Sequence, residues 1–523
     1  MNKNEEIQRE NMKNIIEEFN HYFNDLVNGK IDRYGIIFKT SQNKYYFDTG
    51  TGKVLQCSDV VYELLHHLFL HEGKIVPKEW RQATEDLLAA MKELKEAIKQ
   101  EHIFMAKELT GFQCEHKCNL EQSVGKVCTQ LILEVTDECN LRCKYCVYED
   151  DTKNFRAFGH KKMSFDTAKK AMDYVLKIAP QDTMYLAFYG GEPLLNYSLI
   201  KQCTEYFSEQ YTGEELILSF TSNLTLLTQE MAQYFSEHKF SITCSLDGDQ
   251  QTHDQNRVYA NQKGSFHDTI RGLRMLVEAY GEHTELININ MVVTRPYSNE
   301  KFDRIQKFFD DLDWLPKNVA IRTSYEGIDE WNENTSLLPN YHLIEDHYNF
   351  RDDLEEWICD AVQSGKNKDS LYTSSALDSG MTTIHQRRIT DHPMEQRGFN
   401  GCCIPGSRRL YVTVDGNYTV CERIGDSPYI GNVDTGIDIE QVRKYYVEQY
   451  EQKSLENCNN CWCVNLCGLC YARAYDENGL DMKRKKVLCE GERYSNYRYL
   501  QKYHTLLEKC PEVLQEYADK EYI

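Results

Sequence analysis

Strand-like and helix-like segments alternate between Thr129 and residue 325, and this alternation constrains the fold more than any other feature of the chain. Apolar runs such as LILEVT (131–136), MYLAFYG (184–190) and ILSFTSN (217–223) are each followed by a helical pattern. About six such repeats predict a parallel sheet covered by helices, because parallel strands are joined by crossovers that bury both faces. The expected fold class is therefore α/β, with the sheet either open or, as we predict, rolled into a partial (β/α)6, TIM-like barrel.

The chain of 523 residues is too long for a single core, and its pattern divides it into several segments. A polar helix is followed by a small α+β domain, the repeating barrel, a helical bridging region, a cysteine-rich domain with a hairpin, and a terminal helix. Their expected bounds are 1–30, 31–110, 129–325, 326–400, 401–491 and 492–523.

The charge balance argues against a nucleic-acid partner. Asp and Glu number 82 against 60 Lys and Arg, a net charge of −22, whereas phosphate contacts need a cationic surface. No run of about 18 apolar residues predicts a transmembrane helix, and the polar start of the chain lacks a signal-peptide core. We therefore expect a cytoplasmic protein with neither nucleic acid nor membrane as a partner.

The 20 cysteines are the unusual part of the composition. In a reducing compartment disulfides are disfavoured, so clustered cysteines favour metal binding or catalysis. Three cysteines lie between Cys139 and Cys146, and nine lie between Cys402 and Cys489. We interpret the three scattered over residues 114–128 as small buried hydrophobes in preference to a further metal site, namely Cys114, Cys118 and Cys128.

Cys139, Cys143 and Cys146 form a C-x3-C-x2-C motif directly after the first strand of the predicted barrel. Three thiolates on one loop can hold three irons of a [4Fe–4S] cube and leave the fourth iron open. A structural zinc site would need a fourth ligand at short range, which this stretch lacks. The competing interpretation is that these are coincidental loop cysteines.

With Tyr145 before its last cysteine, this motif resembles that of the radical S-adenosylmethionine (SAM) superfamily. The resemblance implies that the open iron binds the amino and carboxyl groups of SAM. One electron from the cluster then cleaves SAM, and the 5′-deoxyadenosyl radical takes a hydrogen from the substrate.

The second predicted strand ends in Gly190-Gly191-Glu192-Pro193, which is similar to the GGEP segment of that superfamily. Two glycines permit a close backbone approach, and a glutamate can accept hydrogen bonds from an ammonium group. The resemblance therefore implies that Gly190, Gly191 and Glu192 contact the amino end of SAM.

Two further strand ends carry similar segments. Ser222 and Asn223 match a family ribose contact, although Leu224 stands where the family has glycine. Ser245 and Arg257 belong to a segment resembling SLDG…HD…R and are implied to contact the cofactor carboxylate or ribose, with a simple turn as the competing interpretation of the Asp-Gly pair. All these motifs fall at carboxyl ends of strands, where barrel active sites form.

The C-terminal cysteines resemble the SPASM extension of peptide-modifying radical enzymes, which carries two auxiliary [4Fe–4S] clusters. The family pattern has three residues between the cysteines matched by Cys467 and Cys470, and this chain has two. The resemblance assigns three cysteines to the first auxiliary cluster, namely Cys403, Cys421 and Cys470. It assigns four to the second, namely Cys458, Cys461, Cys467 and Cys489.

Two spare cysteines lie inside this region. Cys402 is an alternative to Cys403, because neighbouring side chains of an extended segment point to opposite faces; Cys463 has no assigned role. The first auxiliary cluster can instead keep an open iron that binds a substrate thiolate. A zinc ribbon is the competing interpretation of the CxxC pairs.

Residues 33–105 are similar in pattern to the RiPP recognition element, a winged-helix-like domain that binds the leader of a ribosomal precursor peptide by strand addition. A capping subdomain without a ligand is the alternative. The resemblance implies a precursor peptide as a partner, together with an electron donor such as flavodoxin or ferredoxin.

Together these features predict a radical SAM peptide maturase that forms thioether links between a cysteine sulfur and a carbon. Formylglycine formation, as in anaerobic sulfatase-maturing enzymes, and carbon–carbon crosslinking are alternatives. For the former, Glu422 directly after Cys421 is a candidate base, or else an exposed surface glutamate. A non-catalytic iron–sulfur or zinc scaffold that binds peptides is the alternative from another class.

Overall fold

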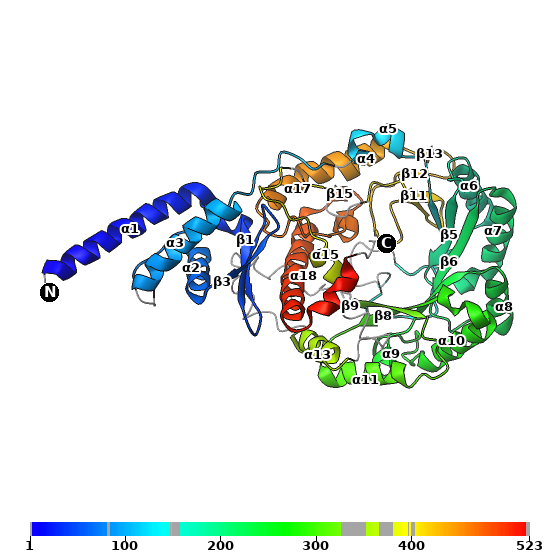
Figure 1. The fold of residues 1–523 in the computed structure, drawn as a ribbon. Coiled ribbons are helices and arrows are strands. Elements are labelled where there is room, and N and C mark those ends of the chain that lie inside the picture. The colour runs from blue at the N-terminus through cyan, green and yellow to red at the C-terminus, as the bar shows by residue number, and fades with distance from the viewer. Residues whose placement is uncertain are drawn as a thin grey trace.

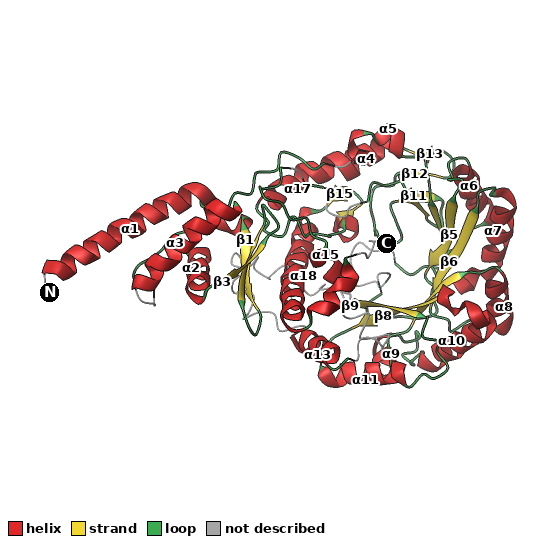
Figure 2. Ribbon diagram, in the orientation of Figure 1, coloured by secondary structure: helices red, strands yellow, loops and turns green. Residues whose placement is uncertain are grey.

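The computed structural model of the chain describes residues 3–80, 84–113, 115–146, 148, 157–296, 298–325, 352–365, 380–395, 397–398 and 403–518. An α/β body with a curved central sheet is joined at its N-terminal side to a smaller α+β unit (Figure 1). Figure 2 shows that helices cover the outer face of the central sheet.

The N-terminal unit has its own apolar core, to which Phe19, Phe23, Leu64 and Phe104 contribute. Helix α1 (Lys3–Val27) begins far from the body and reaches the core with its C-terminal half (Figure 1). An antiparallel sheet in the order β1-β2-β3 and two helices complete the unit, with bounds Gly35–Lys39, Lys44–Asp48, Val54–Cys57, Asp59–Leu70 (α2) and Thr84–Glu101 (α3).

Strands β4 to β9 pair in parallel in the order of the sequence. Their bounds are Gln130–Thr136, Thr183–Gly190, Glu215–Ser222, Ser241–Ser245, Ile287–Val293 and Ala320–Tyr325. On the face of the sheet that the helices cover, the side chains are fully buried, as at Leu131, Leu186 and Ile289, and they belong to the largest apolar core of the described residues. The α/β class with a mostly parallel sheet is confirmed.

The hairpin predicted in the cysteine-rich domain forms, and it also extends the central sheet. Strand β10 (Arg409–Val412) pairs in parallel with β4, and β11 (Asn417–Thr419) turns back antiparallel to β10. Strands β12 (Gly431–Asn432) and β13 (Gly436–Ile437) continue the edge. The cysteine-rich region is thereby joined to the barrel beside the strand that precedes the first cysteine motif.

The crossover helices lie along the outside of the curved sheet (Figure 1). Their bounds are Phe165–Leu176 (α6), Tyr197–Gln210 (α7), Gln229–Glu237 (α8), Gln250–Asn256 (α9), Phe266–Tyr280 (α10) and Asn299–Asp310 (α11). Among the described residues, the remaining α-helices and short strands are Glu115–Cys118 (α4), Leu120–Ser123 (α5), Asp352–Gln363 (α13), Met381–His385 (α15), Ile439–Gln441 (α16), Gln449–Asn459 (α17), Tyr475–Asp476 (β14), Gly479–Leu480 (β15) and Met482–Lys509 (α18).

Helix α18 lies across from the sheet, beside β1 (Figure 1). It begins at Met482 instead of the predicted residue 492, because the Asp481 side chain accepts a hydrogen bond from the backbone N–H of Lys483 and caps the helix. In the region 326–400, the described part contains α13 and α15, while residues 326–351 and 366–379 lie outside the described residues.

Within the described part of the chain, no helix combines the length and the apolar character that crossing a membrane requires.

Candidate iron–sulfur centres and cofactor pocket

The loop that follows β4 brings Cys139, Cys143 and Cys146 together, and we call these three residues the loop trio. All three are half-buried; Cys143 and Cys146 raise the pKa of Cys139, and Cys146 raises that of Cys143. The backbone N–H of Cys146 donates to the carbonyl of Cys143 at 2.9 Å, which closes a tight turn. Burial raises the pKa of Cys143 to about 11, and the nearby Arg257 guanidinium opposes this rise. The motif therefore places three thiols on one short loop at the carboxyl end of a barrel strand.

Gly190 and Gly191 lie directly against this loop. The Gly191 N–H donates to the carbonyl of Thr136 at 2.9 Å, and the next N–H donates to the carbonyl of Glu138 at 2.9 Å. A Cβ at Gly190 or Gly191 would lie 2.0 Å or 2.3 Å from these same backbone oxygens. The two glycines thus allow the strand end to hold the backbone of the cysteine loop.

Glu192 is buried beside the loop trio, with 1% of its surface exposed. Its carboxylate accepts hydrogen bonds from Ser222 Oγ at 2.8 Å, Asn223 N at 2.9 Å and Leu194 N at 3.1 Å. Burial raises the pKa of Glu192 to about 7, against the effect of these donors. Glu192 also raises the pKa of Cys139, so the carboxylate and this thiol are neighbours.

Asn223 links the third strand end to the cysteine loop. Its amide donates to Asn140 Oδ1 at 3.0 Å, and its own Oδ1 accepts from Thr225. Leu224 adopts φ +61°, a left-handed conformation that a glycine would take without strain. The chain therefore keeps the turn geometry that glycine favours, although leucine occupies the position.

Asp247 organises the opposite side of the loop trio. This fully buried carboxylate accepts from Arg257 Nε at 2.9 Å, from the hydroxyl of Tyr145 and from Val292 N at 2.9 Å. The central carbon of the Arg257 guanidinium lies 5.3 Å from the centre of the Tyr145 ring. Ser245 is buried at the end of β7, next to this group.

Asp247 was not predicted as a site residue, because an Asp-Gly pair after a strand is also typical of a simple turn. Because Asp247 forms a buried ion pair with Arg257, it does more than form a simple turn. The available signal was the arginine ten residues downstream, because a buried arginine needs an acidic partner.

Cys403, Cys421 and Cys470 form a second group, which we call the C-terminal trio. Cys470 raises the pKa of Cys421, and Cys403 raises that of Cys470, so the three lie near one another. Cys403 and Cys470 are exposed, and Cys421 is half-buried. Cys402 lies outside the described residues.

Glu422 lies beside the C-terminal trio, and 15% of its side chain is exposed. Its carboxylate is 3.4 Å from Arg409 Nη1 and 3.8 Å from Arg423 Nε. Burial and the nearby Glu422 carboxylate both raise the pKa of the Cys421 thiol, to about 11. It is therefore not a freely exposed surface glutamate.

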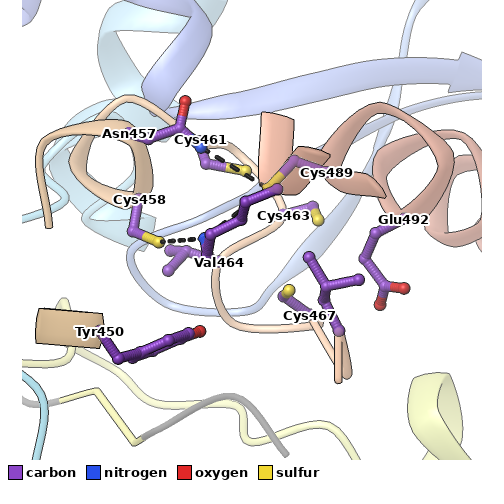
Figure 3. Close-up of a pocket in the computed structure, with 11 residues that line it drawn as sticks. Tyr450, Asn457, Cys458, Cys461, Cys463, Val464, Cys467, Cys489 and Glu492 are labelled. Atoms are coloured by element: carbon purple, nitrogen blue, oxygen red, sulfur yellow. Dashed lines mark hydrogen bonds between the residues drawn. The ribbon is translucent and has the colours of Figure 1, made fainter. Parts of the chain in front are cut away.

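Cys458, Cys461, Cys467 and Cys489 line one cavity (Figure 3), and we call them the C-terminal quartet. Three come from the end of α17 and the loop after it, while Cys489 comes from α18. Burial raises the pKa of Cys458 to about 12 and that of Cys489 to about 11. Cys463 is a fifth thiol in this cavity, and its hydrogen bond lowers the pKa of Cys461.

Among the described residues, no group of three or more His, Cys, Asp or Glu side chains is arranged to hold a single metal ion. A cube binds each thiolate at a different iron, so its ligands do not converge on one point.

The cysteines at 114–128 do not share one environment. Cys128 is buried and its thiol donates to the carbonyl of Gln130 at 3.3 Å, whereas Cys118 is exposed. Cys114 lies outside the described residues. The interpretation as buried hydrophobes therefore describes Cys128 and is wrong for Cys118.

Residues 133–309 match the family model of the radical SAM superfamily. Uncharacterized protein MJ0907 of Methanocaldococcus jannaschii is 33% identical over 222 residues, which cover 41% of this chain and 72% of that protein. The chain belongs to the radical SAM superfamily. It is an enzyme of radical chemistry, and its family implies a [4Fe–4S] cluster and SAM.

The radical SAM chain is also similar to the cysteine-type anaerobic sulfatase-maturating enzyme of Clostridium novyi. The two are 24% identical over 378 residues, covering 70% of this chain and 93% of that enzyme. The solved structure of native anSMEcpe with bound AdoMet matches with a TM-score of 0.51 and 21% identity, covering 75% of this chain and all of that one. This structural likeness supports the barrel-like fold.

The residues of this radical SAM chain fit the groups that its family implies. The loop trio offers three thiols, the ligand type of iron–sulfur clusters, at the carboxyl end of a strand. The neighbouring Glu192 is buried and ionisable, and it can accept hydrogen bonds from an ammonium group. Glu192 and Asn223 connect the ends of β5 and β6 to that loop.

Proposed function

We propose that this radical SAM enzyme acts on a ribosomally made precursor peptide and joins a cysteine sulfur of it to a carbon as a thioether. The observation that carries this proposal is the C-terminal trio, in which Cys403 and Cys470 are exposed. A cube held by three thiols has one iron left for another ligand. A peptide cysteine can supply that ligand as its thiolate.

The three groups of cysteines have separate roles in this proposal. The loop trio holds the cluster at which SAM binds, and the C-terminal trio and quartet hold two auxiliary [4Fe–4S] clusters. When bound, cluster and SAM together supply a 5′-deoxyadenosyl radical that takes a hydrogen atom from the substrate.

The protein side chains around the loop trio position SAM. Glu192 accepts from its amino group, while Ser222 and the backbone of Asn223 fix the Glu192 carboxylate by the hydrogen bonds described above. Tyr145 and Arg257 border the cofactor beside Cys143, held in place by Asp247, and Ser245 lies at the adjacent strand end.

The reaction removes two hydrogens from the peptide for each link. One leaves the carbon as a hydrogen atom, and the cysteine thiol loses the other as a proton. The new sulfur–carbon bond forms with release of one electron, which the auxiliary clusters can accept.

The N-terminal unit is the expected site for the leader of the peptide. Helix α18 holds the β1–β2 hairpin, since Gln501 donates to the carbonyl of Lys39 at 3.0 Å and Glu508 accepts from Thr40 and Tyr45. In the described sheet, β3 pairs with β2 and forms the other edge. A leader peptide can therefore add as a strand along β3.

Formylglycine formation is the second candidate. The sulfatase-maturating relative, matched over most of its length, and the position of Glu422 beside Cys421 favour it. In that reaction Glu422 would act as the base that takes the proton from the thiol of the cysteine, or the hydroxyl of the serine, that is being oxidised.

The deciding experiment combines the anaerobically reconstituted enzyme, SAM and dithionite with a cysteine-containing precursor peptide encoded beside its gene. Dithionite replaces the flavodoxin or ferredoxin that we expect as electron donor. A thioether appears by mass spectrometry as the loss of two hydrogens per link, in a product that resists thiol alkylation. An aldehyde that reacts with a hydrazide would instead establish formylglycine, and absence of 5′-deoxyadenosine would leave only a peptide-binding scaffold.

A further inference from the structure

One face of α18 carries a basic residue on each side of a predicted cluster ligand. Lys485, Cys489 and Arg493 are four residues apart, a spacing that aligns side chains along one side of a helix. All three are buried, with 2%, 8% and 6% of their surface exposed. Lysine and arginine are rarely buried to this degree, so their surroundings must favour positive charge.

Both basic side chains point to sulfur atoms of the C-terminal quartet. Lys485 Nζ lies 3.9 Å from Cys458 Sγ and 3.8 Å from Cys489 Sγ. Arg493 Nη1 lies 3.7 Å from Cys461 Sγ. Three of the four thiols thus receive a donor from a cationic side chain of one helix.

The two basic residues differ in what else they contact. Arg493 is paired with Glu490 of its own helix, and that carboxylate offsets part of its charge. Lys485 Nζ lies 5.5 Å from the centre of the Tyr450 ring, an arrangement that also favours the charged ammonium. Arg33 and Arg397 border an adjacent small cavity that reaches Cys458 and Cys461. Lys485 is therefore expected to have the larger effect on the quartet.

We propose that Lys485 and Arg493 are positioning residues that raise the reduction potential of the cluster held by the C-terminal quartet. This inference rests on the ligation in the proposed function. Reduction adds one negative charge to a thiolate-bound cluster, and buried cations that donate to its sulfurs stabilise that added charge. A raised potential makes this cluster a better acceptor for the electron released when the thioether forms.

The test uses the full chain carrying Cys139, Cys143 and Cys146 changed to alanine, so that the C-terminal clusters are observed alone. In this background K485Q and R493Q remove one charge each, and K485R keeps it. K486Q is the matched control, because Lys486 is an exposed lysine on the same helix. Each protein is assayed for iron and sulfide and titrated anaerobically, with reduction followed by electron paramagnetic resonance.

We expect K485Q to lower the equilibrium constant for one-electron reduction about tenfold, which corresponds to about 59 mV. R493Q is expected to have a smaller effect in the same direction, and K485R and K486Q are expected to match the parent. If K485Q or R493Q keeps its full iron content and its reduction potential is unchanged, the inference is overturned. If K485Q and R493Q both lose iron, the K485R variant decides. A reduction potential equal to that of the parent supports the charge effect, and a tenfold fall in the equilibrium constant for reduction contradicts it. Absence of iron and sulfide from the parent itself would refute the proposed ligation instead.

Discussion

The loop trio and the C-terminal quartet supply the same kind of ligand by opposite means. The loop trio lies within eight residues of one loop, directly after β4. The quartet combines a short loop with Cys489, which lies on α18, 22 residues beyond Cys467. The first group is therefore arranged by local backbone geometry, and the second by the packing of a long helix.

Their surroundings differ as well. The loop trio has the buried carboxylate of Glu192 on one side and the Asp247–Arg257 ion pair, with its guanidinium near Cys143, on the other. Basic side chains of α18 donate toward the quartet. A site that must receive a cationic, sulfonium-bearing cofactor gains from acidic neighbours, whereas a site that only exchanges electrons gains from cations that stabilise its reduced form.

The largest effect is expected when the loop trio is removed. Changing Cys139, Cys143 and Cys146 to alanine should abolish all detectable 5′-deoxyadenosine, because in the proposed ligation these thiols hold the cluster at which SAM binds. Iron and sulfide at the C-terminal groups should remain. Chromatography of the product together with iron assays measures both, and C118A, which changes an exposed cysteine on α4, is the control. Product formed by the triple variant would falsify the assignment.

The next prediction concerns the buried Asp247–Arg257 ion pair beside the loop trio. D247A should lower the free energy of unfolding by about 3–5 kcal/mol, because it leaves Arg257 buried without its acidic partner. Urea denaturation monitored by circular dichroism measures this change. The double variant D247A/R257M removes both charges, and its free energy of unfolding should fall by less than that of D247A. Equal losses in the single and double variants would show that the ion pair does not account for the effect.

Weakening the packing of α18 should affect the C-terminal quartet and leave the loop trio unaffected. L500A removes a fully buried side chain from this helix and should cost about 3 kcal/mol of stability. Because α18 carries Cys489, the variant should also bind less iron at the quartet while 5′-deoxyadenosine formation persists. L507A, at a position on the same helix with 44% exposure, should change stability by less than about 0.5 kcal/mol. Equal iron loss in both variants would contradict the role of helix packing.

The most gradual effect concerns pH. Burial lowers the pKa of His253 to about 4, and its neutral ring accepts from Asp247 N at 3.3 Å. As pH falls from 6.5 to 4, the unfolded chain binds a proton that the folded chain does not, so stability declines by at most about 1.4 kcal/mol per pH unit. Melting temperatures measured across this window should fall less in H253Q than in the unchanged protein. Parallel curves for the two proteins would refute this contribution.

The sequence predicted those parts of the molecule that depend on short-range patterns. The β/α repeats predicted the parallel sheet, since each strand and crossover helix has its own periodicity. The GGEP segment was recognised, but the contact that requires its glycines, with the carbonyls of Thr136 and Glu138, is between distant segments. Asp247 was missed for the same reason, because its partners Tyr145 and Val292 are remote in the chain.

The sequence by itself determined where the loop trio lies and which strand precedes it, because its spacing and its place in the β/α pattern act over a few residues. The resemblance also assigned the remote cysteines to two groups, but only the tertiary structure decided how they are brought together and which charges surround them. That outcome depends on how α17 and α18 pack, and on strand β10, which pairs with β4 and joins the C-terminal trio to the barrel. Packing of this kind sums many long-range contacts, and no local motif specifies it.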